Sequence, residues 1–132
     1  MSNEPISLQA ALKTFDELWS PRIVARINDY DVRVTKVAGD YVWHVHENTD
    51  EFFLVIDGEL GIGLRDGEPG EERDVILPAG SAFVVPKGVY HKPFSDGGAS
   101  IVVIEPAGQP TTGDRHEDIP DHIRTHTGLE LT

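Results

Sequence analysis

The chain has 132 residues, no cysteine and a formal net charge of −12 at pH 7. This length favours a single domain, and the lack of cysteine excludes disulfides, zinc–thiolate sites and thiol nucleophiles. The negative charge argues against nucleic acids and anionic membrane surfaces as partners. No stretch reaches the roughly 18 apolar residues that cross a bilayer. Residues 1–10 lack the basic and apolar regions of a secretory signal, so we expect a cytoplasmic protein.

Residues 1–20 predict one helical segment that packs on the rest of the chain. Ser7 can cap the helix, and Leu8, Leu12 and Phe15 recur at helical spacing. The pattern ends at Pro21, because the residue before a proline avoids the helical region.

From residue 21 to residue 106 the apolar period changes to two, and short strands alternate with Gly/Pro turns. The predicted strands cover residues 23–27, 32–37, 41–46, 51–56, 59–65, 74–77, 81–85, 89–94 and 99–105. Turns are expected at residues 57–58 and 95–98, among others. Many short strands without long helices predict an all-β sandwich or closed barrel.

Residues 107–132 have a different composition. Gly and Pro interrupt this segment and few apolar residues remain. We predict a C-terminal tail or strap that packs on the barrel or on a partner subunit.

The first chemical signal is the pair His44 and His46. Residues i and i+2 of a strand point to one face, so both imidazoles can reach one point. Two surface histidines on an edge strand would give the same pattern. A carboxylate follows at the start of the next strand, which is apolar on both faces, so a charge there needs a partner or a metal. Strand phase does not decide between Asp50 and Glu51 for this role.

A second signal is Pro86-x-Gly88-x2-His91, where a tight turn places another histidine at the start of a strand. With it, two segments of the chain resemble the two motifs of the cupin superfamily. They are Gly39-x4-His44-x-His46-x4-Glu51-x6-Gly58 and Gly80-x5-Pro86-x-Gly88-x2-His91-x3-Ser95. The first is one residue shorter than the family pattern before His44, and Ser95 stands where asparagine is usual.

More narrowly, the chain resembles the small single-domain cupins labelled mannose-6-phosphate isomerase-like, a label that says little about the reaction. The resemblance implies a double-stranded β-helix, the cupin or jelly-roll barrel, over residues 21–106. It also implies one metal ion held by His44, His46, Glu51 and His91, and so selects Glu51 over Asp50.

Three imidazoles and one carboxylate suit Fe(II), Mn(II), Ni(II), Zn(II) or Cu(II), and suit Mg or Ca poorly. Ligands from one wall of a barrel leave positions open to water or substrate, as catalytic sites do. We therefore expect a metal-dependent enzyme acting on a small oxygen-rich molecule by dioxygenase, isomerase or lyase chemistry. The alternative is a non-catalytic module that binds a small ligand or a metal. A sugar-phosphate isomerase ranks low, because the basic residues are not clustered.

Phe53 and Val55 share the phase of Glu51 and are predicted to line the pocket. Lys36 is a further pocket candidate if the face it shares with Val34 points inward. Otherwise it is a rim lysine whose stem covers apolar surface. Arg33, on the opposite face, is expected in solvent.

Tyr41 and Trp43 alternate away from the histidines, so they are expected outside the barrel. With outward residues such as Phe52, they predict an apolar patch and a homodimer. Three further histidines in the tail are not expected to be ligands, because that segment lacks regular geometry. They are His116, His122 and His126.

Overall fold

The structure is a computed structural model that describes residues 4–131; residues 1–3 and 132, which the sequence assigns to the N-terminal segment and the tail, lie outside it. One short helix precedes nine strands. They are α1 Leu8–Leu12, β1 Arg22–Ile27, β2 Tyr30–Asp40, β3 His44–Val45, β4 Glu51–Arg65, β5 Arg73–Pro78, β6 Ala82–Val85, β7 Tyr90–Pro106, β8 Arg115–His116 and β9 Leu129–Glu130. Within residues 4–131, no helix is long and apolar enough to cross a membrane.

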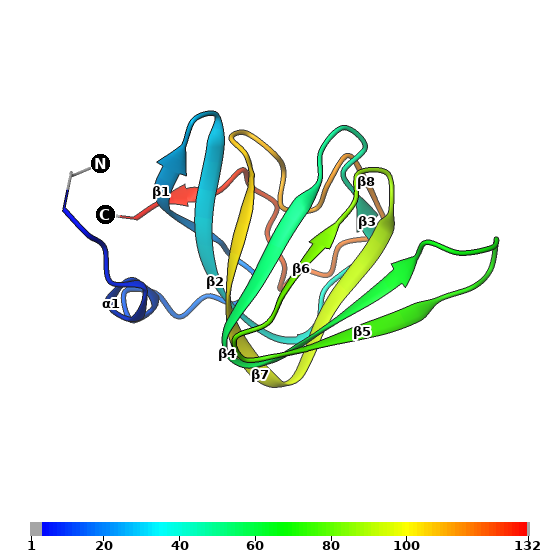
Figure 1. Cartoon of the computed structure of the whole chain (residues 1–132), viewed down its shortest axis with the longest axis horizontal. Helices are drawn as coiled ribbons and strands as arrows, with labels where there is room; N and C mark the ends of the chain where they lie inside the picture. Colours follow the sequence, from blue (N-terminus) through cyan, green and yellow to red (C-terminus); the bar gives the residue numbers. More distant parts are fainter. Residues whose placement is uncertain (1–3, 132) are drawn as a thin grey trace.

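Two long antiparallel strands, β4 and β7, form the centre of the fold (Figure 1). The sheet order is β5-β4-β7-β2-β1-β9, with β6 beside the first part of β4 and β3 beside β7. Both central strands bend strongly, so the sheet curls around an apolar interior. This arrangement confirms the predicted all-β, jelly-roll type of fold.

The predicted turns at Asp57–Gly58 and Ser95–Gly98 are wrong, because both segments lie inside the long strands. The register between β4 and β7 shifts after Val55 and again after Gly58. Gly58 therefore lies at a β-bulge and not in a turn. Gly58 has a φ of +78°, and a Cβ there would lie 2.2 Å from the carbonyl oxygen of Gly98. A glycine in a strand pattern indicates a bulge as readily as a turn.

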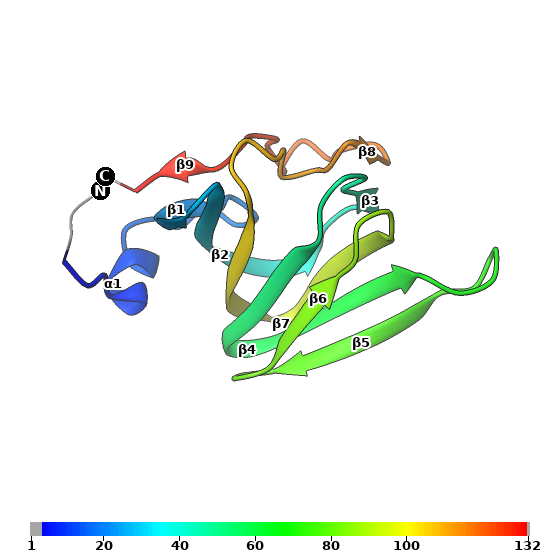
Figure 2. The ribbon, with the colours of Figure 1, turned by 45° about the horizontal axis from the view of Figure 1, so that its top comes forward.

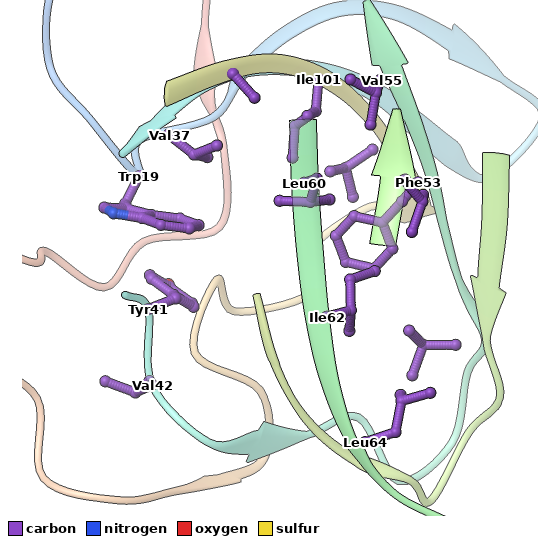
Figure 3. Packing of buried hydrophobic residues seen from close by; sticks show 14 of the residues in the cluster. Trp19, Val37, Tyr41, Val42, Phe53, Val55, Leu60, Ile62, Leu64 and Ile101 are labelled. Atoms are coloured by element: carbon purple, nitrogen blue, oxygen red, sulfur yellow. The ribbon is translucent and has the colours of Figure 1, made fainter. Parts of the chain in front are cut away.

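Both faces of β2 are covered by other parts of the chain, but the inward face carries the polar Arg33 and Thr35 beside Val37, so its sequence pattern is misleading. Val37 points inward and joins the main core with Phe53, Leu60 and Ile101 (Figure 3). Val34 points outward and is buried under α1 in a second cluster. The helix therefore gives the barrel a second apolar layer.

The N-terminal helix is shorter than its pattern predicts. Ser7 caps it as expected, with its Oγ accepting from the Ala10 backbone N–H at 3.1 Å. The helix ends by Lys13, and the chain then runs along β2, where the backbone N–H of Trp19 donates to the Lys36 carbonyl at 2.9 Å. Trp19 lies in the left-handed region, with a φ of +56°, and its ring turns into the barrel.

The tail packs across its own barrel (Figure 2). Its strand β8 pairs with β3, and β9 pairs in parallel with β1. Between them, Thr112 and Ile123 are buried. Residues 107–131 therefore act as a strap that covers the barrel from β3 to β1.

Candidate metal centre

The four predicted ligands come together from separate strands. His44 lies in β3, His46 just after it, Glu51 begins β4, and His91 follows the first residue of β7. Because β3 pairs with β7, His44 and His91 are direct cross-strand partners. All four side chains are buried, and one ligand-type atom of each lies within 4.8 Å of the others.

The Glu51 carboxylate lies between two of the imidazoles. Its Oε1 is 3.0 Å from Nε2 of His91 and 3.5 Å from Nε2 of His46. The rings of His44 and His91 have centroids 4.2 Å apart. Two ligand atoms that each lie about 2.0–2.2 Å from one ion are themselves about 3–3.5 Å apart, so these spacings suit a shared ion.

A carbonyl oxygen lies beside the Nδ1 atom of each histidine. The partners are Val42 O for His44 at 2.8 Å, Val89 O for His91 at 3.0 Å, and Gln109 Oε1 for His46 at 3.3 Å. An Nδ1–H that donates to a carbonyl fixes the ring orientation and leaves the Nε2 lone pair for a metal. The partner of His46 comes from the strap, whereas the other two are backbone groups close in sequence.

Burial and neighbouring charges set the protonation states. Burial, together with His91, lowers the pKa of His44 to about 3, so this ring stays neutral. Burial alone would raise the pKa of Glu51, but the neighbouring imidazoles of His46 and His91 outweigh it and hold the pKa well below its usual value. Burial alone would lower the pKa of His46, yet Glu51 raises it. A carboxylate and a neutral imidazole are the forms that bind metal.

The donor set fits a divalent transition metal. Among the described residues, Nε2 of His46 is buried and makes no hydrogen bond. Leaving such a nitrogen unpaired is costly, and an ion at this point would satisfy it. Nitrogen and carboxylate ligands in this ratio suit Fe, Mn, Ni, Zn or Cu.

A small cavity of about 40 Å³ that opens to solvent lies beside the cluster. His44 and Glu51 form part of its wall. The side chains of Trp19, Tyr41 and Phe53, which Figure 3 labels, supply aromatic surface. The rings of Trp19 and Tyr41 stack with centroids 4.7 Å apart.

Two predictions about β2 are wrong for the same reason. Lys36 points away from the cavity, and its Nζ donates to the Phe15 carbonyl at 2.7 Å. Arg33 points inward and is fully buried rather than solvated. Val32 and Val34 indicate an inward face, but they lie on the outer face, where helix α1 and its neighbours cover them.

Of the other pocket candidates, Phe53 lines the cavity, whereas Val55 lies in the core away from it. Tyr41 was expected outside the barrel but is buried inside it, because the chain leaves the strand between residues 41 and 43. Trp43 is half-buried on the outside under the Arg65 guanidinium, 3.9 Å from the ring centroid. The three tail histidines lie outside the four-residue cluster.

Sequence reasoning missed two residues near the cluster, Glu105 and Gln109. Glu105 shares the inward phase of Ile101 and Val103 at the end of an otherwise apolar strand, and a lone charge in such a run signals a buried partner. Gln109 carried no comparable signal, because it belongs to the strap and its position depends on tertiary packing.

Comparison with known proteins gives the family. The cupin domain family matches residues 32–109, and the chain belongs to it. The crystal structure of a cupin-2 domain containing protein from Shewanella frigidimarina NCIMB 400 is 42% identical, with a TM-score of 0.70, over 76% of this chain and 93% of that one.

Two curated relatives match shorter regions. An uncharacterized protein, YdbB, from Bacillus subtilis (strain 168) is 36% identical over 69 residues, 52% of this chain and 57% of that protein. A 3-hydroxyanthranilate 3,4-dioxygenase from Brucella anthropi is 36% identical over 86 residues, 60% of this chain and 45% of that protein. The matches therefore span about half the length of these relatives.

Proposed function

We propose that this cupin is a metal-dependent enzyme that binds one divalent transition metal on His44, His46, Glu51 and His91 and oxygenates a small oxygen-rich molecule. The observation that carries the proposal is the buried, unpaired Nε2 of His46 beside an open cavity. Dioxygenase chemistry is preferred over isomerase or lyase chemistry because one relative is a dioxygenase. The identity of the metal is left to experiment.

Different residues of the chain would bind the metal, contact the substrate and orient one of the ligands. The four ligands would bind the ion, which when bound supplies Lewis acidity and redox chemistry. Trp19, Tyr41 and Phe53 would exclude water and hold the apolar part of the substrate. The strap would keep His46 in its ligating tautomer through Gln109.

The test uses protein loaded anaerobically with Fe(II) and then mixed with O2 and a panel of small diols and hydroxy acids. We expect O2 consumption that depends on both iron and one class of substrate. The matched control is the iron-loaded His116→Ala variant, which removes an exposed histidine outside the cluster and should behave as the parent. If iron binds stoichiometrically but no candidate is consumed, the enzymatic proposal fails.

The second candidate is a non-catalytic module that binds a small ligand or a metal. The observation that favours it is the buried four-residue cluster itself, which can hold an ion without any turnover. Saturable binding of a panel member to the metal-loaded protein, without turnover, would support this candidate.

A further inference from the structure

Glu105 is a buried carboxylate that stands outside the four-residue cluster but lines the same cavity. Only 2% of its surface is exposed. Its Oε1 accepts a hydrogen bond from Nη1 of Arg33 at 2.7 Å. Its Oε2 has no hydrogen-bond partner among the described residues and lies 3.7 Å from Nε2 of His46. The free oxygen is therefore turned toward the cluster.

The ion pair with Arg33 uses only Oε1 of Glu105 and leaves Oε2 without a hydrogen-bond donor. Arg33 is fully buried, and its Nη2 donates to Asp31 at 3.1 Å and to the Thr127 carbonyl at 2.8 Å. Asp31 already supplies a buried counter-charge, and the strap supplies a carbonyl. The guanidinium instead holds the Glu105 carboxylate in one orientation, because a single short charge-assisted bond fixes Oε1.

A buried oxygen without a partner costs free energy, so its natural complement is a hydrogen-bond donor that enters the cavity. An ammonium group is a poor complement, because the Arg33 charge lies on the other oxygen of the same carboxylate. A neutral hydroxyl supplies the donor without added charge. The aromatic wall formed by Trp19, Tyr41 and Phe53 suits an aromatic or apolar body beside that hydroxyl.

We propose that Glu105 is a specificity residue whose Oε2 accepts a hydrogen bond from a hydroxyl group of the bound molecule. The molecule is then a hydroxylated compound with an aromatic or apolar body. This inference rests on the proposed function, since it names the substrate class of the same cavity. It predicts that the cavity discriminates against compounds in which the hydroxyl is methylated, because Oε2 then stays unpaired.

The test compares phenol with anisole, its methyl ether, on protein loaded with redox-inert Zn(II). Burial and the charge of Glu51 raise the pKa of Glu105 well above its usual value. Dissociation constants are therefore measured by ligand-observed NMR at about pH 8.5 on the zinc-loaded protein, in which the charge of the ion offsets that of Glu51. We expect the parent to bind phenol at least about tenfold more tightly than anisole, as for a hydrogen bond to a charged group. Zinc content is measured on every sample.

Glu105→Gln is the informative variant. Nη1 of Arg33 can only donate, so it should hold the amide oxygen and turn the NH2 group toward the cavity. The preference for phenol should then fall below about twofold or reverse, because an NH2 group donates to the ether oxygen. The matched control is Glu72→Gln, which changes an exposed carboxylate paired with Arg65 and should keep the parental preference.

Several results would overturn the inference. They are an absence of preference in the parent, an unchanged preference in Glu105→Gln, or loss of zinc from that variant, which would make Glu105 a metal ligand. If Glu105→Gln does not fold, the crystal structure of the zinc-loaded parent protein with phenol tests the inference instead. The inference requires the phenol oxygen within about 3.2 Å of Oε2. Turnover with Fe(II) tests the proposed function separately, so either can fail while the other stands.

Discussion

At the residue scale, His46 differs from the other two histidines in how its Nδ1 atom is held. His44 and His91 use backbone carbonyls two residues away, so their orientation follows from the local chain. His46 uses the side chain of Gln109, which arrives with the strap. Partners of this kind typically change metal affinity by about 10–100-fold. The strap is therefore part of the site and not only a cover.

The protonation of His46 predicts how metal affinity depends on pH. Its pKa is raised by Glu51, so a proton competes with the metal already above the usual histidine value of about 6.5. His44, with a pKa of about 3, does not compete in this range. Affinity should fall about tenfold per pH unit below the pKa of His46, as one proton is displaced. Competition titrations with a chelating indicator measure it, and a pH-independent affinity would be the contrary result.

Removing one ligand should weaken metal binding without unfolding the protein. In His91→Ala the barrel keeps its apolar core, so circular dichroism should show a native sheet. Metal affinity should fall by more than the roughly 100-fold that loss of an outer partner costs. His116→Ala, an exposed histidine that pairs with His44 across β3 and β8, is the control and should bind as the parent. Parental affinity in His91→Ala would mean that the second motif is a feature of the fold alone.

At the element scale, the strap depends on close contact with β3. Gly113 has a φ of +72°, and a Cβ there would lie 2.4 Å from the carbonyl oxygen of Val45, between two of the histidines. Gly108 has a φ of +85° but open space around it. An alanine would be strained at both positions but would clash with a neighbour only at position 113. Comparing the two substitutions therefore separates the effect of backbone strain from that of the steric clash.

Gly113→Ala should lower the free energy of unfolding more than Gly108→Ala. Both variants carry the strain of a left-handed alanine, about 1–2 kcal/mol. Gly113→Ala adds a clash that should cost a further ~1–3 kcal/mol. It should also speed amide hydrogen exchange in residues 107–131. Urea unfolding and exchange measurements check this, and equal effects of the two substitutions would show that the strap does not rest on β3.

How far the sequence predicts the fold and the site varies between elements. The two motifs are local in sequence, so the resemblance to the cupin superfamily is enough to select His44, His46, Glu51 and His91, whereas strand phase alone leaves Asp50 and Glu51 open. Which face of β2 points inward is not a local property, because α1 covers the outer face, where the apolar Val32 and Val34 lie. For this reason the sequence pattern alone leaves the side on which Lys36 lies undecided.

At the scale of the whole molecule, the apolar core does not depend on the metal. Buried residues such as Leu60, Ile62 and Ile101 form one cluster through the barrel. A metal that binds only the native state adds about 2.7 kcal/mol at a hundred-fold excess over its dissociation constant. A chelator should therefore lower the melting temperature and leave a folded apoprotein. Loss of the β-sheet signal at room temperature would instead make the ion a structural requirement.

The homodimer stays a prediction, with a surface that differs in part from the one that the sequence pattern indicates. Tyr41 is inside the barrel, so it is not free for an interface, whereas Leu54 is half-buried beside the cluster beneath α1. Tyr30 and Val84 remain exposed around half-buried Phe52. Light scattering at micromolar concentration should give twice the chain mass, and a monomeric mass would refute the prediction.

A single metal ion held by four side chains is central to every function considered for this protein, and anomalous diffraction from metal-loaded crystals tests it most directly. We expect a single strong peak bonded to Nε2 of His44, His46 and His91 and to a carboxylate oxygen of Glu51, at about 2.0–2.2 Å if the metal is zinc. A crystal without a peak at this point would contradict the assignment, as would a peak bonded to Asp50 or to a tail histidine.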